Sequence, residues 1–378
     1  MALPTTMKGL ILHKDNTIKL ETTLPVPSPT YGSTVIRVLA AMANPNLVHM
    51  LRSDAGSHAF TQPRPLVPGG YFVGRVAAAG SDATVLAEGQ LVMVESFVRA
   101  RDDPSVQILW GMNDGSAPET KKLHLAWRNA SYAEYVRAPM ENTYVLDEKR
   151  LCGSVSGGGL GYSVNDLVHF IALAVPYGGF RSVSLQAGET VVVSPATGLF
   201  SGSAIAIALA MGANVIAVSR SEAGLARIKT MFPSVSTVLS SGDNETDTAA
   251  ITAAAGTHAP DVFIDLFPPG ATGATGVTAC MMAVRPYGRI VLMGGRGDAN
   301  IPVPWPVVVF RNLTIKGGFM YERDDVRQVI RLLEGGHVKL GNENGYEIAG
   351  TFKLEEWDEC ADAAVEHTSF GKLVLVTP

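Results

Sequence analysis

Residues 190–220 read TVVVSPATGLFSGSAIAIALAMGANVIAVSR. The opening run, 190–194, is rich in β-branched residues, which is typical of a strand buried on both faces of a parallel sheet. Residues 199–211 are small and apolar and predict a buried helix that ends at Gly212. Residues 214–218 form a second run of strand type. The order strand, turn, helix, strand predicts a doubly wound parallel α/β sheet of the Rossmann kind.

The same alternation continues towards the C-terminus, whereas the first third of the chain has a different pattern. After residue 220 we predict a helix at 223–232 and strands at 262–266, 289–293 and 313–317. In the first third, short β-like runs are separated by Gly and Pro, as in a mostly antiparallel β domain. These runs are 8–13, 35–40, 74–79, 91–95 and 132–137. Near the C-terminus, helices at 324–334 and 357–366 and a strand at 371–376 are predicted to return to the first domain.

We therefore expect two domains, which a length of 378 residues also favours. Residues 161–311 are predicted to form the nucleotide-binding Rossmann domain. Residues 1–160, completed by residues 312–378, are predicted to form the β domain.

The composition argues against several classes of partner. Hydrophobic residues make up 47% and charged residues 17% of the chain, which argues against disorder. A net charge of −5 argues against nucleic acid and anionic membranes, so we expect a small-molecule substrate as the partner. Cys152, Cys280 and Cys360 are isolated and indicate neither a disulfide framework nor a cysteine-rich zinc site. With no signal-peptide pattern and no membrane span, we expect a cytoplasmic protein.

The turn after the first strand is the candidate cofactor site. Its glycines are spaced Gly198-x-x-x-Gly202, and the strict G-x-G-x-x-G pattern is absent. Taken alone, this spacing also fits a tight structural turn. The flanking strand and Ala-rich helix favour a dinucleotide, because backbone N–H groups and the helix dipole can hold a pyrophosphate there. The predicted cofactor-binding residues of the turn are Thr197, Gly198, Leu199, Phe200 and Ser201.

The end of the second strand indicates which nicotinamide fits. NAD sites place Asp or Glu at this position, but this chain has Ser219 and Arg220. Because Arg220 can hold a 2′-phosphate as a fork, we predict NADPH as the cofactor; the alternative is a solvated loop arginine. Other loops at the same sheet edge are predicted to contact the cofactor, or else to contain only turn glycines. They contribute Phe267, Gly294, Gly295, Gly318 and Phe319.

Residues 65–81 (PLVPGGYFVGRVAAAGS) together with 131–135 (SYAEY) resemble the medium-chain dehydrogenase/reductase superfamily. The resemblance implies that the β domain is a GroES-like domain that precedes the Rossmann domain and carries catalysis. In zinc-dependent members a Gly-His-Glu triplet stands where this chain has Gly69, Gly70 and Tyr71, and a metal-binding Cys stands where it has Asn44. Neither Gly, Tyr nor Asn offers a thiolate or an imidazole, so we expect no bound metal.

The resemblance is to the zinc-independent, quinone oxidoreductase-like and enoyl reductase-like members, many of which carry the Asn-Pro dipeptide found at Asn44-Pro45. Residues 46–49 (NLVH) depart from their usual pattern. Because zinc normally polarises the substrate oxygen, its loss favours hydride transfer from NADPH to a conjugated C=C or a quinone. Two alternatives remain open: a metal-free carbonyl reductase or alcohol dehydrogenase, and a non-catalytic NADPH-binding protein.

Candidate catalytic residues are few. Tyr71 is predicted to donate a hydrogen bond to the substrate, or else to line the cleft as an aromatic side chain. Asn44 is predicted to bind the nicotinamide ribose or the substrate oxygen, or else to form a turn before Pro45. His49 and Tyr132 are predicted to line the substrate site, with a packed or surface histidine and a fold marker as their alternatives.

Two further segments lie outside these motifs. Residues 96–129 occupy the place where many zinc members have a four-cysteine metal lobe, but they contain no cysteine. We interpret them as a surface insertion held down by Trp110 and Trp127. By the same resemblance, a homodimer is expected to form through an apolar edge strand at 300–314.

Overall fold

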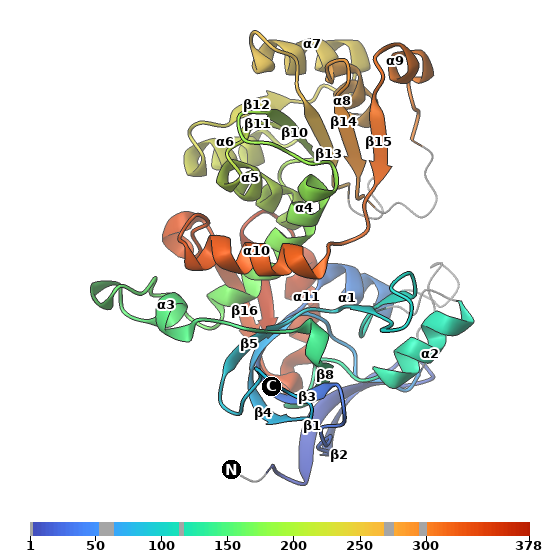
Figure 1. Cartoon of the computed structure of the whole chain (residues 1–378), viewed down its shortest axis with the longest axis vertical. Coiled ribbons are helices and arrows are strands. Elements are labelled where there is room, and N and C mark those ends of the chain that lie inside the picture. The colour runs from blue at the N-terminus through green and yellow to red at the C-terminus, as the bar shows by residue number, and fades with distance from the viewer. Residues whose placement is uncertain (1–2, 53–63, 113–116, 268–275, 295–300) are drawn as a thin grey trace.

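The structure, a computed structural model, describes residues 3–52, 64–112, 117–267, 276–294 and 301–378. Figure 1 shows two lobes along the long axis, with a parallel sheet and its helices at one end and a β domain at the other. Helix α10 (Arg323–Glu334) lies between them. Within the described residues, no helix is both long enough and apolar enough to cross a bilayer.

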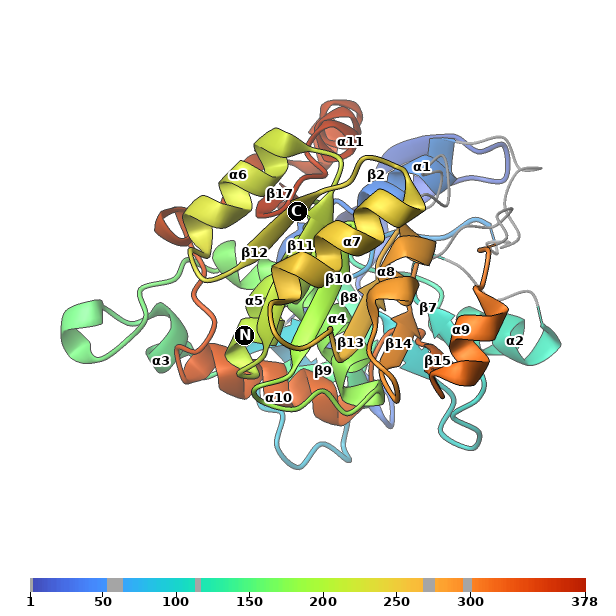
Figure 2. The same ribbon diagram turned by 90° about the horizontal axis from the view of Figure 1, so that it is seen from above.

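The first lobe is a six-stranded parallel sheet with the strand order β12-β11-β10-β13-β14-β15. Figure 2 shows these strands between helices that cover both faces of the sheet. The strands are β10 (Thr190–Ser194), β11 (Asn214–Ser219), β12 (Ser236–Leu239), β13 (Val262–Asp265), β14 (Arg289–Leu292) and β15 (Thr314–Gly317). The helices are α4 (Phe170–Ser182), α5 (Leu199–Ala210), α6 (Glu222–Met231), α7 (Asn244–Ala255), α8 (Val277–Ala283) and α9 (Trp305–Phe310).

The valines of β10 show why this strand is central. Val191 and Val193 face the core that includes α4 and α5, while Val192 faces the core that includes α7 and α8. All three are fully buried, because alternate residues of a strand point to opposite faces and helices cover both. The predicted Rossmann fold is thereby confirmed.

The second lobe is a seven-stranded sheet with the order β16-β17-β3-β4-β5-β9, in which β8 also pairs with β3. Only the β16–β17 pair is parallel. The strands are β3 (Ser33–Met42), β4 (Phe72–Ala79), β5 (Leu91–Val94), β8 (Tyr135–Pro139), β9 (Thr143–Val145), β16 (Glu347–Phe352) and β17 (Lys372–Val376). Two hairpins flank this sheet: β1 (Thr6–Leu12) with β2 (Ile18–Pro25), and β6 (Phe97–Arg99) with β7 (Gln107–Leu109). This is the GroES-like domain, and β17 brings the C-terminal segment beside β3.

Two sequence-based boundaries are corrected. Strand β15 pairs with β14, so the nucleotide domain extends past residue 311 to Gly317. The predicted edge strand at 300–314 instead contains helix α9, followed by β15; Asn300 lies outside the described residues. Proline explains the helix, because Pro306 fits the first helical turn but cannot donate to a strand ladder.

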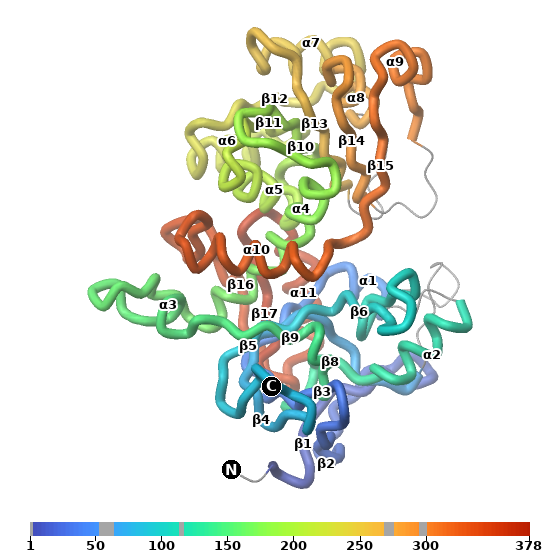
Figure 3. The backbone as a smooth tube through the Cα atoms, viewed as in Figure 1, coloured from blue at the N-terminus to red at the C-terminus, as the bar shows by residue number. Residues whose placement is uncertain are grey.

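Segments outside the two sheets pack on the domain surfaces. Trp110 of the 96–129 segment is fully buried against Phe72, and its indole N–H donates to the carbonyl of Asn129 over 3.1 Å. Figure 3 shows that the segment around α3 projects from the side of the molecule. The remaining helices are α1 (Pro45–Arg52), α2 (Pro118–Ala126), α3 (Glu148–Cys152) and α11 (Trp357–Glu366), with short 3-10 turns at Met140–Asn142, Val155–Gly157, Asp166–His169, Asn342–Asn344 and Leu354–Glu356.

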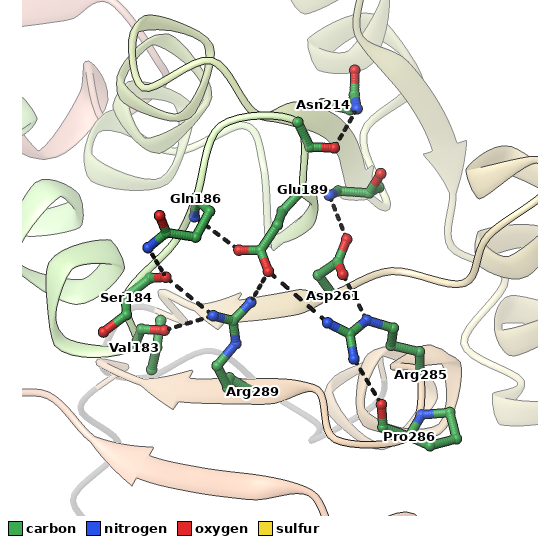
Figure 4. A network of polar contacts seen from close by, with 11 residues as sticks. Val183, Ser184, Gln186, Glu189, Asn214, Asp261, Arg285, Pro286 and Arg289 are labelled. Carbon is green, nitrogen blue, oxygen red and sulfur yellow. Dashed lines mark hydrogen bonds and ion pairs between the residues drawn. The ribbon is translucent and has the colours of Figure 1, made fainter.

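A polar network ties together the N-terminal ends of the parallel strands (Figure 4). Asp261 accepts hydrogen bonds from the backbone N–H of Thr190 at 2.8 Å and from Nε of Arg285 at 2.6 Å. Glu189 pairs with Arg289, whose guanidinium also donates to backbone carbonyls at the end of α4. Ligands of this fold bind at the opposite, carboxyl ends of the strands, so we assign this network a structural role.

Candidate active site

The nucleotide turn joins β10 to α5 at the carboxyl edge of the sheet. Gly198 caps the helix, and its N–H donates to Oγ of Ser201 over 3.1 Å. A Cβ atom on Gly202 would lie 2.2 Å from Cγ of Phe370, so only glycine allows the C-terminal segment to pack against this helix. The two glycines therefore have different structural roles. Gly198 is the N-cap residue of helix α5, and Gly202 lacks the Cβ that would clash with Phe370.

The C-terminal segment occupies part of the predicted pyrophosphate cradle. The N–H of Leu199 donates to the carbonyl of Thr368 over 3.0 Å, and the N–H of Phe370 donates to the carbonyl of Thr197 over 2.9 Å. Leu199 was predicted to bind the cofactor, but its backbone N–H already donates to Thr368 and is not free for a phosphate. The N–H groups of Phe200 and Ser201 lie in the first helical turn, where no intrahelical acceptor exists, and they add to the positive helix end. The turn thus fits a phosphate group through these two residues.

The structure brings Ser219 to the turn. Its hydroxyl lies 3.0 Å from the hydroxyl of Thr197 and accepts the N–H of Ser221 over 3.1 Å. Ser219 is buried, so it ties the ends of β10 and β11 together. Arg220 is exposed beside it. Of the two predicted phosphate ligands, Ser219 is buried and already hydrogen-bonded, whereas the side chain of Arg220 is accessible to a cofactor.

A buried carboxylate organises the neighbouring loops. Asp265, the last residue of β13, accepts the N–H of Phe267 over 3.1 Å. A Cβ atom on Gly294 would lie 2.7 Å from the same carboxylate, which explains a glycine at that position. Burial raises the pKa of Asp265, whereas the hydrogen bonds it accepts lower it. The sequence offered one signal for Asp265, an acidic residue that ends an apolar strand; Gly295 lies outside the described residues.

The crossover after β15 brings the two domains together. The N–H of Gly318 donates to the carbonyl of Leu292 over 2.9 Å. The ring of Phe319 meets the ring of Phe97 edge-on, with centroids 5.3 Å apart, and Tyr321 contacts the same ring at 6.1 Å. The guanidinium carbon (Cζ) of Arg99 lies over the Phe97 ring, 4.3 Å from its centroid. Phe319 therefore lies at the domain junction, and its exposed fraction is 56%.

At the positions where the sequence resemblance would place zinc ligands, the residues make local hydrogen bonds. Oδ1 of Asn44 accepts the N–H of Asn46 over 2.9 Å, so Asn44 caps helix α1 as a turn former. The N–H of Gly70 donates to Oγ of Ser131 over 3.0 Å. Across the described ranges, no group of three or more His, Cys, Asp or Glu side chains is arranged to hold a metal ion. These positions supply neither the thiolate nor the imidazole that a catalytic zinc site requires.

Tyr71 belongs to a buried polar cluster that the sequence analysis missed. Its hydroxyl lies 3.3 Å from the hydroxyl of Tyr321, which lies 3.0 Å from Oε2 of Glu95. The exposed fractions are 5% for Tyr71, 3% for Tyr321 and 1% for Glu95. Burial raises the pKa of both tyrosines, and it raises the pKa of Glu95 to about 8. Glu95 had a weak signal, a carboxylate after the apolar run 91–94, and Tyr321 had none.

The two predicted substrate-lining residues, Tyr132 and His49, lie in different environments. Tyr132 has no exposed surface; its hydroxyl donates to the carbonyl of Met42 over 3.1 Å, and its ring packs on Trp357. It is a core residue of the β domain, because both its ring and its hydroxyl are already satisfied there. His49 lies exposed on helix α1. The cluster of Tyr71, Tyr321 and Glu95 thus takes the place of these residues as the candidate reaction site.

Comparisons with known proteins agree with this two-domain arrangement. The Alcohol dehydrogenase GroES-like domain model matches residues 30–148, and the Zinc-binding dehydrogenase model matches residues 201–335. A 2-methylene-furan-3-one reductase of Solanum lycopersicum is 29% identical over 140 residues, which are 37% of this chain. The match spans only 35% of the length of that curated relative.

Solved structures share the fold over nearly the whole chain. A thermostable alcohol dehydrogenase from Pyrobaculum aerophilum is 20% identical, with 98% and 99% of the two chains covered and a TM-score of 0.71. An alcohol dehydrogenase from E. coli CFT073 in complex with NADH is 18% identical, with 99% and 100% covered and a TM-score of 0.74. A Sinorhizobium meliloti 1021 protein assigned as a zinc-binding dehydrogenase, bound to NADP, is 19% identical, with 99% and 100% covered and a TM-score of 0.72. With matching models in both domains, this chain belongs to the medium-chain dehydrogenase/reductase superfamily of oxidoreductases.

Proposed function

We propose that the protein is a zinc-independent, NADPH-dependent oxidoreductase that transfers a hydride to a conjugated C=C or to a quinone. The observation that carries this proposal is the replacement of the family's metal ligands by Asn44, Gly70 and Tyr71, with the Tyr71 hydroxyl in a buried chain of hydrogen-bonding groups. A hydroxyl is a weaker electrophile than zinc. It suffices where conjugation already spreads the charge that arrives with the hydride.

The tomato relative supports the substrate class. Its name specifies a furanone whose methylene group is conjugated with a ketone. That compound belongs to the relative and serves here only as an example of an activated acceptor. A conjugated acceptor needs one hydrogen-bond donor at the oxygen that gains charge, and Tyr71 is the candidate donor.

The nucleotide turn supports a nicotinamide cofactor, which supplies the hydride when bound. Phe200 and Ser201 offer N–H groups to its pyrophosphate. Arg220, which is exposed at the end of β11 next to Ser219, offers its guanidinium to a 2′-phosphate. Gly294, Gly318 and Phe319 are proposed to face the nicotinamide end, because they lie at the carboxyl edge of the sheet next to the domain junction.

One activity panel tests the proposal. The purified protein is mixed with NADPH or NADH and with enones, quinones, unconjugated ketones and aldehydes, with and without a chelator. We expect NADPH oxidation with the conjugated acceptors and no effect of the chelator. Preference for unconjugated carbonyls would favour a metal-free carbonyl reductase or alcohol dehydrogenase. Tight NADPH binding without turnover of any acceptor would favour a non-catalytic NADPH-binding protein.

A further inference from the structure

The hydroxyl of Tyr321 lies between two acceptors but has one proton. It is 3.0 Å from Oε2 of Glu95 and 3.3 Å from the hydroxyl of Tyr71. A phenolic hydroxyl donates one hydrogen bond at a time. The three groups therefore form a chain in which Tyr321 can donate to only one of its two neighbours, Glu95 or Tyr71.

The protonation state of Glu95 sets the neighbour to which Tyr321 donates. When Glu95 is ionised, Tyr321 donates to Glu95, and Tyr71 then donates to Tyr321. The proton of Tyr71 then points away from the substrate. When Glu95 is protonated, it donates to Tyr321, Tyr321 donates to Tyr71, and the proton of Tyr71 is no longer used within this chain. Ser96 is a second hydrogen-bonding neighbour of the Tyr71 hydroxyl, and the substrate oxygen competes with it for this proton.

Hydrogen bonds to both oxygens of Glu95 fix the position of its carboxyl group. Oε2 also accepts the N–H of Phe97 over 2.6 Å, and Oε1 accepts the side-chain amide of Asn142 over 2.5 Å. The amide of Asn142 also donates to the carbonyl of Phe97 over 3.0 Å, which fixes its orientation. Burial raises the pKa of Glu95 to about 8, and the charges of two arginines lower it. The charged and ionisable groups that face Glu95 are Arg99, Arg323, Tyr71, Tyr144 and Tyr321.

We propose that Glu95 and Tyr321 form a proton relay that reloads Tyr71 during each reduction. This inference rests on the proposed function. Hydride addition to an enone leaves an enolate, whose oxygen takes the proton of Tyr71. Tyr71 regains a proton from Tyr321, Tyr321 regains one from Glu95, and the Glu95 carboxylate is reprotonated from solvent. The sum is one hydride and one proton added to the substrate. Tyr71 is the catalytic residue, whereas Tyr321 and Glu95 are positioning residues that act through it.

The first test requires no turnover. Infrared spectroscopy of the protein without cofactor should show the carbonyl band of a protonated carboxylic acid at neutral pH, and this band should disappear as the pH rises through about 8. The band should be absent in Glu95→Gln. It should shift in frequency in Tyr321→Phe, because the acid loses its hydrogen-bond acceptor. A spectrum without this band, or a band that Tyr321→Phe leaves unchanged, would overturn the relay.

The second test is the pH profile of turnover. In the parent protein, the turnover number for the best acceptor should fall above pH 8, where Glu95 ionises and the chain reverses. Glu95→Gln can donate an N–H to Tyr321 but cannot release a proton. In both Glu95→Gln and Tyr321→Phe, the fall in turnover above pH 8 (the alkaline limb of the profile) should disappear. The turnover number should also be lower by at least about tenfold, which is less than general acid catalysis typically contributes. The double variant should be no slower than either single variant.

Two matched variants control for structural damage. Glu189→Gln removes a carboxylate from the network at the far edge of the sheet (Figure 4). Tyr346→Phe removes a buried hydroxyl for which the described part of the chain holds no hydrogen-bond partner. Both should keep the parent's alkaline limb. If the parent turns over while Glu95→Gln keeps the limb and its rate, the relay is wrong and the proposed function stands. If the parent turns over no acceptor, the proposed function fails, and the infrared test still decides whether the chain exists.

Discussion

At the scale of single residues, the candidate site depends on groups that are far apart in the sequence. Tyr71 and Tyr321 are separated by 250 positions, and Tyr321 and Glu95 by 226. The motif around Tyr71 predicted its position because a known family pattern aligns with it. Nothing local predicted its two partners, since their contact depends on the crossover from the nucleotide domain. The sequence also could not show that Tyr132 satisfies its hydroxyl inside the core.

Tyr71→Phe should lower turnover by about two to three decades, because the donor to the developing oxyanion is lost. The affinity for NADPH should change little, since the substitution leaves the nucleotide turn intact. Steady-state kinetics and a cofactor titration measure the two effects separately. Full activity of Tyr71→Phe on the best conjugated acceptor would show that Tyr71 only fills space.

Arg220→Asp should weaken NADPH binding by roughly 2 kcal/mol or more, because it removes a charged donor and adds a repulsive charge. NADH binding should be affected much less, since NADH lacks the 2′-phosphate. Fluorescence titration with both cofactors measures the difference. If the parent protein binds NADPH and NADH equally well, the assignment of Arg220 is wrong.

At the scale of elements, the sequence predicted the central strands of the parallel sheet and several helices, but it missed the buried helix α4. The prediction for 357–366 has the bounds of α11 (Trp357–Glu366), and the prediction for 289–293 nearly matches β14. It missed β2, whose residues IKLETTLP are mostly half-buried or exposed and do not alternate. The sequence also predicted an edge strand where the structure has helix α9, because a short apolar segment at a domain surface is compatible with a strand or a helix. Elements with weak burial therefore need the tertiary structure to define them.

Gly202→Ala tests how the C-terminal segment supports the nucleotide turn. The added methyl would lie 2.2 Å from Cγ of Phe370, so the ring must move and the Phe370–Thr197 hydrogen bond must weaken. Overpacking of this kind costs about 1–3 kcal/mol, and NADPH affinity should fall with it. Denaturant unfolding and cofactor titration measure both. Gly317→Ala is the control for stability, because its added Cβ would meet no atom within 4 Å from the described residues beyond its chain neighbours. Equal stability of the two variants would refute the packing argument.

At the scale of the whole molecule, the order of strands and helices predicted the two-domain fold, and the motifs at residues 65–81 and 131–135 indicated the superfamily by resemblance. The sequence did not predict the domain junction, where Phe97, Phe319 and Tyr321 meet, since that contact joins segments from two domains. It also left the substrate open. The substrate depends on the shape around the junction, which no short motif encodes.

The outer edge of the nucleotide domain is the proposed dimer surface. On α9, the exposed fractions are 73% for Trp305 and 84% for Phe310, and the neighbouring β15 ends the sheet. Burying these side chains against a second copy would stabilise an isologous dimer. We expect sedimentation to show a dimer at micromolar concentration and Phe310→Asp to shift it towards monomer. A parent protein that sediments as a monomer would contradict this surface assignment.

The central claim is that this chain reduces activated acceptors without zinc. The most direct measurement compares NADPH oxidation with an enone and with the saturated ketone of the same carbon skeleton, both in the presence of a zinc chelator. We predict that kcat/KM for the enone is higher by at least about tenfold, which corresponds to roughly 1.4 kcal/mol of transition-state free energy. An equal or higher kcat/KM for the saturated ketone, or loss of activity with the chelator, would contradict the claim.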